Sequence, residues 1–186
     1  MKHIFLAVSG ASGSIYASKA AAFLKSCSDV KLHITISPAG RKIFLHELGQ
    51  AALDEMLSDV EYLHDYDDMA SSVASGSFPL AGAAIIPCSL SSAMSIAAGL
   101  ANNLSLRVAQ VALKEKLPLV LLIRETPLDA IHLENLALLS RSGAVIMPAS
   151  PQFYSKPSSI DDLASETAGR ALKYLGIEVP DLFHWG

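Results

Sequence analysis

Five short runs of this chain are apolar at nearly every position, and helix-like patterns separate them. A strand needs apolar residues on both sides only when both of its faces are buried, as in a parallel sheet with helices on either side. The alternation along the chain therefore predicts an α/β fold with a doubly wound parallel sheet of the Rossmann-like type. The expected strands are 3–9, 30–36, 82–87, 118–123 and 143–147.

The intervening segments carry the helical patterns. A stretch that is acidic and then rich in Ser and Gly, 59–81, is expected to form one weak strand followed by a loop. Because no linker or internal repeat divides the sequence, residues 1–186 are expected to form a single domain. The expected helices are 14–26, 39–48, 91–98, 104–116, 129–141 and 161–175.

The charged surface is small, because only 17% of the residues are charged and 51% are hydrophobic. Either part of the surface is buried against other subunits, or an Ala-rich helical core explains the composition. A net charge of −4 gives no reason to expect nucleic acid as a partner. Two cysteines make no disulfide framework, and we find no signal peptide and no apolar run of membrane-spanning length. A cytoplasmic location is therefore expected.

The turn after the first expected strand, Ser9–Ser14, leads directly into a helical pattern. Such a turn offers backbone N–H groups to a phosphate, or is merely a tight connection. It contains Gly10 and Gly13 but not the dinucleotide pattern G-x-G-x-x-G, and it has no Gly-Lys-Ser/Thr of the Walker type. The position for a ribose-binding carboxylate is taken by Ser37 or Pro38. These features argue against NAD and favour a mononucleotide.

A second hydroxyl-rich turn follows the strand at 82–87 and begins another expected helix, in the sequence Pro87-Cys-Ser-Leu-Ser-Ser92. Serine there is also a normal helix N-cap. Cys88 is interpreted as a small buried hydrophobe, with a nucleophile as the alternative. Since ligands bind outside the carboxyl ends of parallel strands, the two hydroxyl-rich turns together predict a site for a phosphate and a ring.

Several motifs, in this order, match a known family over essentially the whole chain, and the chain resembles the flavin prenyltransferases, the UbiX-type proteins of ubiquinone biosynthesis. The matching segments are Ser9-Gly-Ala-Ser-Gly13, Ala74-Ser-Gly-Ser-Phe78, Pro87-Cys-Ser89, Asn102-Asn-Leu with Arg107, Ala112-Leu-Lys-Glu115, Arg124-Glu-Thr-Pro127, His132-Leu-Glu-Asn135, Gly143-Ala-Val-Ile-Met-Pro148, Phe153-Tyr154 and Leu182-Phe-His-Trp185.

The resemblance implies an enzyme that binds FMN and a prenyl monophosphate, usually dimethylallyl phosphate. The family joins the five-carbon unit to N5 and C6 of reduced flavin. The product, prenylated FMN, is the cofactor of a separate UbiD-type decarboxylase. The family needs no metal ion and forms a homododecamer with sites at subunit contacts.

The resemblance also assigns roles to residues of this chain. Ser12 matches a hydroxyl close to the reacting N5, and Glu47 matches a carboxylate used as acid or base in ring closure. The implied FMN contacts are Gly10, Ala11, Ser12, Ser37, Ser89, Leu90, Ser91, Ser92 and Arg124. The implied contacts of the prenyl phosphate are Tyr154 and Arg170, with Arg107, Lys114 and Glu125 as further polar groups. The implied catalytic set is Ser12, Glu47, Lys114 and Glu125.

The leaving monophosphate needs its negative charge stabilised, either by Mg²⁺ on acidic residues or by fixed cations. The acidic cluster Tyr66-Asp-Asp68 is interpreted as a solvated loop, with a metal site as the alternative. Arginine suits bidentate phosphate contact. Arg124 directly follows a buried strand, where an ion pair with Glu125 is the alternative to a ligand contact. His132 is interpreted as structural or as a subunit contact, with catalysis as the alternative.

One departure from the family concerns the prenyl pocket. Many members carry a Trp shortly before the Ala-Ser-Gly-Ser segment, but here the only Trp is Trp185. Tyr66 or Met69 is the candidate replacement. Two other functions compete: an FMN-dependent decarboxylase of the cysteine-decarboxylase type, whose Pro-x-Met-Asn-x-x-Met-Trp segment this chain lacks, and a non-enzymatic flavin carrier.

Overall fold

The computed structural model describes residues 1–180 and 182–184. Its centre is a parallel sheet with the strand order β3-β2-β1-β4-β5-β6. This arrangement confirms the predicted α/β fold class. The strands are β1 (Lys2–Val8), β2 (Val30–Ile36), β3 (Tyr62–Leu63), β4 (Leu80–Cys88), β5 (Leu119–Ile123) and β6 (Val145–Pro148).

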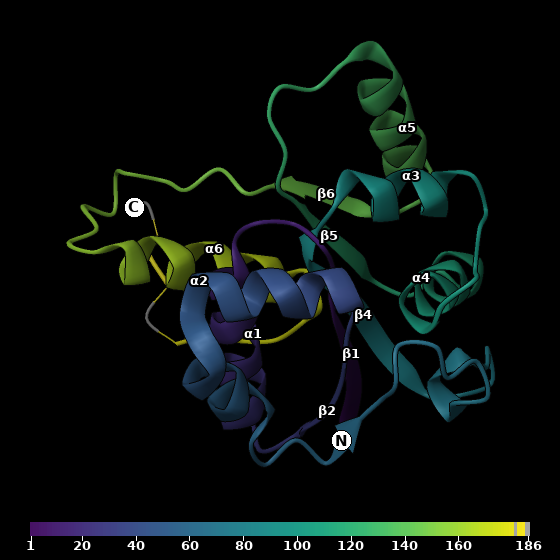
Figure 1. Ribbon diagram of the computed structural model, residues 1–186, viewed down its shortest axis with the longest axis horizontal. Helices are drawn as coiled ribbons and strands as arrows, with labels where there is room; N and C mark the ends of the chain where they lie inside the picture. The colour runs from purple at the N-terminus through teal and green to yellow at the C-terminus, as the bar shows by residue number, and fades with distance from the viewer. Residues whose placement is uncertain (181, 185–186) are drawn as a thin grey trace.

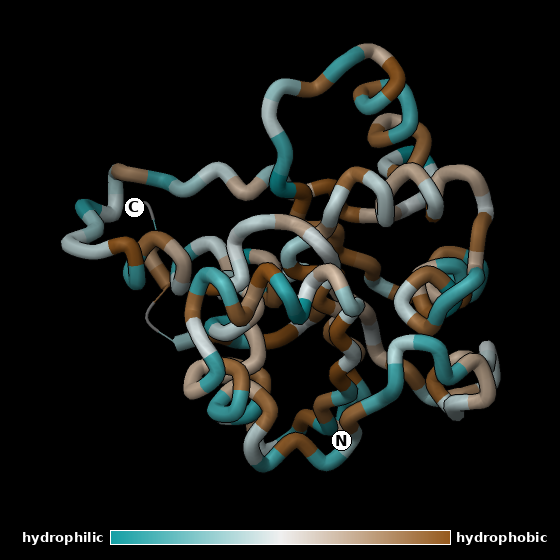
Figure 2. The backbone as a smooth tube through the Cα atoms, in the orientation of Figure 1, coloured by the Kyte–Doolittle hydropathy of each residue, from teal (hydrophilic) through white to brown (hydrophobic). Residues whose placement is uncertain are grey.

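Helices cover both faces of the sheet (Figure 1), as the continuous apolar strands require. Alternate side chains of β1 enter two different cores: Ile4 and Leu6 pack towards α1, α2 and α6, whereas Phe5 and Ala7 pack towards α3, α4 and α5. Figure 2 shows hydrophobic stretches of the trace at its centre, where the strands lie. The helices are α1 (Ser14–Ser26), α2 (Pro38–Leu57), α3 (Leu90–Ala97), α4 (Leu104–Glu115), α5 (Ala130–Arg141) and α6 (Ile160–Lys173).

The sequence-based bounds were wrong mainly at α2, which was expected to end near residue 48. The helix continues to Leu57 after a kink at Gly49, whose φ of 82° lies in the left-handed region. Glycine tolerates that conformation, so it marks a bend here rather than an end. The weak strand and loop expected in 59–81 are confirmed as β3 and a single 3-10 turn, η1 (Ser72–Ala74).

The order of the strands reverses between β1 and β4. The chain proceeds outward from β1 through β2 to β3, and outward in the other direction from β4 to β6. The crevice at the carboxyl ends of β1 and β4 is therefore the topological switch point, where ligands of such sheets bind. The two hydroxyl-rich turns meet there. No helix in the described part of the chain is long and apolar enough to cross a membrane.

Candidate active site

The turns after β1 and β4 are joined by one serine. The Ser9 hydroxyl donates to the Pro87 carbonyl at 2.9 Å and accepts the Ser89 N–H at 2.7 Å. Gly13 ends the first turn with a φ of 105°, and a Cβ there would lie 2.8 Å from the Tyr16 ring. The two turns are therefore held as one backbone surface, with glycine required at its end.

The start of α2 packs closely against the same turn. The buried Ser37 hydroxyl accepts the Gly40 N–H at 2.9 Å and caps the helix. A Cβ on Gly40 would lie 2.7 Å from the Val8 carbonyl oxygen, and a Cβ on Gly10 would lie 2.7 Å from Cβ of Ala39. The absence of side chains at Gly10 and Gly40 lets the start of α2 approach the end of β1 and the turn after it.

The start of α3 supplies further polar groups. The Ser89 hydroxyl accepts the Ser92 N–H at 3.2 Å and lies 3.0 Å from the Ser92 hydroxyl. Capping is thus one role of this serine. The N–H groups of Leu90 and Ser91, in the first turn, have no acceptor within the helix and point out of its N-terminus. That end of α3 favours an anion.

Arg124 completes the arrangement from the end of β5. Its Nε donates to the Ser12 carbonyl at 3.4 Å. Burial raises the pKa of Tyr16, and the nearby Arg124 charge opposes that rise. Glu125 is exposed and accepts the Thr126 N–H, and within the described residues no ion pair joins it to Arg124.

We call the surface formed by these strand ends the cradle. It is built from backbone N–H groups, hydroxyls and one guanidinium. That donor set suits a phosphate and the polar edge of a ring, so the residues fit FMN. The cradle consists of Gly10, Ala11, Ser12, Ser37, Ser89, Leu90, Ser91, Ser92 and Arg124.

Glu47 reaches from α2 to the N-terminus of α1. Its carboxylate accepts the Ser14 N–H at 2.8 Å and the Gly13 N–H at 3.0 Å. Burial raises the pKa of Glu47, but interactions with Ser12, Ser14 and Gly13 outweigh it and leave the pKa below its usual value. Glu47 is therefore an ionised carboxylate beside Ser12, at the positive end of the α1 dipole. The structure brings these two predicted residues together.

Tyr154 and Arg170 lie together in a second place. They line a cavity of about 560 Å³ between the loop after β6, α6 and the C-terminal residues. The Arg170 Nη1 donates to the Gln152 side-chain oxygen at 3.4 Å. The Tyr154 ring centre is 5.5 Å from that of Phe183. The sequence reasoning missed Gln152, because a lone polar residue in a loop gives no signal.

Arg107 and Lys114 lie in a third place, on α4. The Arg107 Nε donates to the Ala74 carbonyl at 2.9 Å, and the Lys114 ammonium is 2.8 Å from the Glu115 carboxylate. Lys114 also lines a hollow among α3, α4 and α5. Among the described residues we find no contact that joins these two cations to the cradle. One chain therefore presents the predicted prenyl-phosphate residues on separate surfaces.

The remaining candidates make local contacts within the fold. Cys88 is fully buried, and burial raises its pKa to about 12, which confirms the small hydrophobe rather than a nucleophile. His132 forms a capping box with Asp129 at the start of α5. The Asp68 carboxylate accepts the Ala70 N–H within its loop. In residues 1–180 and 182–184, no three His, Cys, Asp or Glu side chains cluster as metal ligands would. Trp185 lies outside the described residues.

Comparison with known proteins places the chain in a family. A model of the flavoprotein family, described as "Flavoprotein", matches residues 1–172. A flavin prenyltransferase UbiX from Chlamydia pneumoniae is 47% identical over 183 residues, which span 95% of this chain and 94% of the relative. A flavin prenyltransferase UbiX from Escherichia coli K12 is 39% identical over 98% of this chain and 97% of the relative.

Solved structures agree. The crystal structure of AnUbiX (PadA1) in complex with FMN and dimethylallyl pyrophosphate has a TM-score of 0.93 and 35% identity, covering 100% of this chain and 97% of that one. A dodecameric FMN-dependent Ubix-like decarboxylase from Escherichia coli O157:H7 has a TM-score of 0.92 and 32% identity, covering 99% of each chain. The cysteine decarboxylase TvaF, at 18% identity and a TM-score of 0.64, shares the fold alone. The chain therefore belongs to the flavoprotein family and, within it, to the UbiX-type flavin prenyltransferases.

Proposed function

We propose that this protein transfers the dimethylallyl group of dimethylallyl monophosphate to N5 and C6 of reduced FMN. The product is prenylated FMN, supplied to a UbiD-type decarboxylase. The observation that carries the proposal is the cradle at the switch point with an ionised Glu47 beside Ser12. The relatives named flavin prenyltransferase and the relative crystallised with FMN and a dimethylallyl diphosphate support the same reaction.

The cradle residues are proposed to hold FMN. The turn after β1 and the N-terminus of α3 offer N–H groups to anionic or carbonyl oxygens, and Arg124 adds a charged donor from β5. Reduced FMN supplies the nucleophilic N5 and the carbon C6. Ser12 lies next to Glu47 at the edge of the cradle, where its hydroxyl is proposed to approach N5.

The prenyl phosphate must lose its phosphate as the first bond forms. Arg107, Lys114 and Arg170, with Tyr154 and Glu125 as further polar groups, are proposed to line that site. Fixed cations stabilise a leaving phosphate without a metal, so we propose a metal-independent reaction. Closure at C6 releases a proton, and the Glu47 carboxylate, being ionised, is proposed to accept it.

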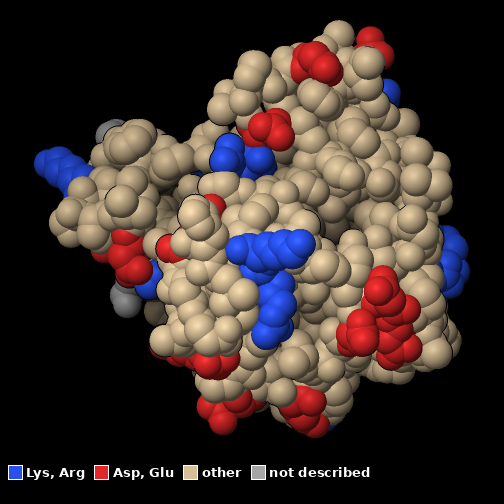
Figure 3. Space-filling view, viewed as in Figure 1, with Lys and Arg blue, Asp and Glu red and all other residues tan. Residues whose placement is uncertain are grey.

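Assembly is proposed to bring the separate groups together. The exposed side chains of Ile131, Leu133, Phe153 and Ile160 are large and apolar. Figure 3 shows only small, scattered groups of charged side chains on the face where α2 lies in front. A related chain is dodecameric. We therefore propose a homo-oligomer, of twelve chains as in that relative, in which α4 of one chain approaches the cradle of another. A cytoplasmic location stays a prediction.

The test is anaerobic incubation with reduced FMN and dimethylallyl monophosphate, followed by mass measurement of the extracted flavin. We expect a flavin heavier by one five-carbon unit, formed at the same rate after treatment with a chelator. Recovery of unmodified FMN alone, from folded protein saturated with both ligands, contradicts the enzyme and supports a carrier. If chelation lowers the rate and Mg²⁺ restores it, the reaction is not metal-independent. Asp67 and Asp68 are then the candidate metal ligands.

A further inference from the structure

One carboxylate ties together three segments around the cavity that contains Tyr154 and Arg170. Oε2 of Glu166, on α6, accepts the Gln152 side-chain N–H at 2.9 Å. Oε1 of the same carboxylate accepts the backbone N–H of Phe183 at 3.1 Å. The Gln152 oxygen in turn accepts from Arg170 at 3.4 Å. None of the steps proposed above uses Glu166 or Gln152.

The chemistry of the carboxylate fixes the direction of this network. An ionised carboxylate only accepts hydrogen bonds, so Gln152 must present its NH₂ group to Glu166. The amide oxygen of Gln152 then faces Arg170, which only donates. An amide turned the other way would place its N–H groups against the guanidinium. Glu166 therefore orients Gln152, and Gln152 orients Arg170.

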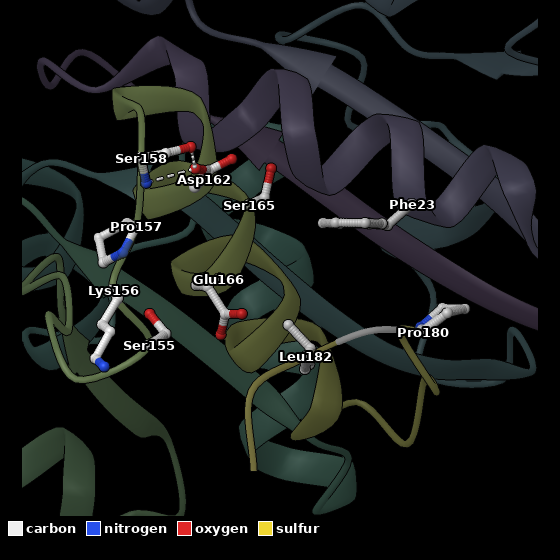
Figure 4. A pocket seen from close by; sticks show the side chains of 10 residues that line it. All are labelled: Phe23, Ser155, Lys156, Pro157, Ser158, Asp162, Ser165, Glu166, Pro180 and Leu182. Atoms are coloured by element: carbon white, nitrogen blue, oxygen red, sulfur yellow. Dashed lines mark hydrogen bonds between the residues drawn. The ribbon is translucent and has the colours of Figure 1, made fainter.

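The second oxygen of Glu166 fastens the C-terminal residues. Figure 4 shows Glu166 projecting from α6 between the segment of Ser155 and Lys156 and the side chain of Leu182. A Cβ on Gly169 would lie 2.6 Å from Leu182, so the C-terminal residues rest on α6 where a side chain is missing. The hydrogen bond to Phe183 and the contact at Gly169 together hold these residues against the cavity wall.

The cavity has two chemical characters. Arg170 and Lys173 are its cationic part, to which Glu166 adds one carboxylate, and Tyr154, Tyr174 and Phe183 are its aromatic part. A phosphate that carries a short apolar chain requires both. Because Glu166 holds Arg170 through Gln152 and Phe183 directly, it acts on both parts at once.

We propose that Glu166 is a positioning residue for the prenyl monophosphate. One carboxylate oxygen orients the Arg170 side chain through Gln152, and the other holds the C-terminal residues at the cavity through the Phe183 N–H. This inference rests on the proposed function. It assigns Glu166 and Gln152 no contact with reacting atoms. Their effect is on the affinity for the prenyl phosphate and not on the affinity for FMN.

The test compares Glu166→Gln with Asp161→Asn. Both variants remove one carboxylate charge from α6, but Asp161 pairs with Lys19 outside the network. In Glu166→Gln one amide nitrogen faces a donor, so one of the two contacts is lost. Dimethylallyl monophosphate is titrated by calorimetry into oxidised, FMN-loaded protein, in which no transfer occurs. We expect its Kd to rise about tenfold in Glu166→Gln. Asp161→Asn is expected to keep the Kd of the wild type.

Three further measurements separate positioning from structural damage. The Kd for FMN and the melting temperature of Glu166→Gln are expected to stay near those of the wild type. Amide exchange at Phe183 is expected to become faster, and KM for the prenyl phosphate is expected to rise with kcat nearly unchanged. Binding of the prenyl phosphate by Glu166→Gln as tightly as by the wild type overturns the inference alone. Failure of wild-type, FMN-loaded protein to bind it overturns the proposed function as well.

Discussion

The cradle and the cavity around Arg170 are built in opposite ways. The cradle consists of strand-end turns whose positions are set by backbone contacts, such as the Ser9 hydroxyl between two turns. The cavity is defined by long side chains on a loop, a helix end and the C-terminal residues. A backbone-built site is formed in the isolated chain. A site built from long side chains needs further contacts to order it.

Exposure follows the same division, because every cradle residue except Ser91 is buried or half-buried. Ser37 is 6% exposed and Leu90 is 8% exposed, whereas Tyr154 is 52% exposed. Fixing an exposed Arg, Lys or Gln side chain costs about 1.5–2 kcal/mol of rotamer entropy. We therefore expect the FMN site to be preformed. The residues that bind the prenyl phosphate are expected to become ordered only through the Glu166 network and through contacts with neighbouring chains.

The largest effect is expected from Glu47→Gln, because Glu47 lies beside Ser12 of the cradle and is the proposed proton acceptor. The amide keeps the shape and one acceptor for the N–H groups of Gly13 and Ser14, but it loses the acid–base group. Formation of the second bond, at C6, is expected to slow by about 10²–10⁴-fold. Absorption spectra of the bound flavin distinguish a prenyl group attached by one bond from one attached by two, since the masses are equal.

Glu55→Gln is the matched control, because it also removes a carboxylate from α2 but lies away from the cradle. It is expected to keep the wild-type rate. Should Glu47→Gln form the second bond as fast as the wild type, the carboxylate only caps α1. The departed phosphate then becomes the candidate base.

A second test asks whether Lys114 of α4 and Arg170 of α6 serve one site from different chains. Lys114→Ala and Arg170→Ala are each expected to lower the rate of transfer by about 10²–10³-fold, because each removes a charge that we propose faces the leaving phosphate. FMN affinity is expected to stay unchanged. Assemblies reconstituted from equal amounts of both variants are expected to regain about a quarter of wild-type activity if one site draws these residues from different chains.

Mixtures of two Arg170→Ala preparations serve as the control and are expected to regain nothing. If the mixed Lys114→Ala and Arg170→Ala assemblies also remain inactive, the two residues come from the same chain. The separation of α4 from the cavity would then have to close by movement within one subunit.

The cradle was predictable from the sequence because its parts are local. A buried parallel strand, a Gly or Ser turn and a helix start are adjacent in the chain, and parallel strands bring their carboxyl ends to one edge. The pairing of Glu47 with the start of α1 leaves no local pattern in the sequence. Glu47 lies near the middle of α2, just before the kink at Gly49, and only packing shows that it faces the N-terminus of another helix.

The cavity was less predictable for the same physical reason. Gln152 and Glu166 lie in a polar loop and on a helix face, where such residues are ordinary. Their roles arise from contacts across many residues of sequence, and those contacts depend on how α6 lies against the C-terminal residues. Arg107 and Lys114 were found only through resemblance, since a cation on a helix face carries no positional signal.

A third test concerns the segment that supports Arg107. The rings of His3, His33 and His64 form a hydrogen-bonded row with 2.9 Å between neighbouring nitrogens, and His64 continues to the Ser71 hydroxyl at 3.0 Å. Burial, and after it the neighbouring His64 and His3, lower the pKa of His33 from 6.5 to about 4. Ser71 directly precedes η1, whose Ala74 carbonyl holds Arg107.

Because the folded state binds fewer protons than the unfolded state, this row stabilises the protein fully above pH 6.5 and loses that effect as the pH falls towards 4. We expect a loss of about 3 kcal/mol in the free energy of unfolding over this range from His33. Urea unfolding at several pH values measures this loss in the free energy of unfolding.

Amide exchange is expected to rise first near residues 64–78 and not at the cradle. His33→Asn should flatten the profile, while the exposed His46→Asn should not; an unaltered profile in His33→Asn contradicts the assignment.

The smallest effect is expected from one methyl group added beside the cradle, in Gly40→Ala. The added Cβ would lie 2.7 Å from the Val8 carbonyl oxygen and 3.0 Å from the Ser9 carbonyl oxygen, and backbone atoms of a central strand cannot move away cheaply. Overpacking of this kind costs about 1–3 kcal/mol, which corresponds to a melting temperature lower by about 2–4 °C per kcal/mol in a chain of this size.

Gly76→Ala is the control, because its Cβ meets only the flexible ends of Lys114 and Glu115. If the cradle is rigid, Gly40→Ala also weakens FMN binding while Gly76→Ala does not. If both variants bind FMN equally well, the cradle is as deformable as the cavity. The distinction between a rigid cradle and a cavity built from long side chains is then wrong.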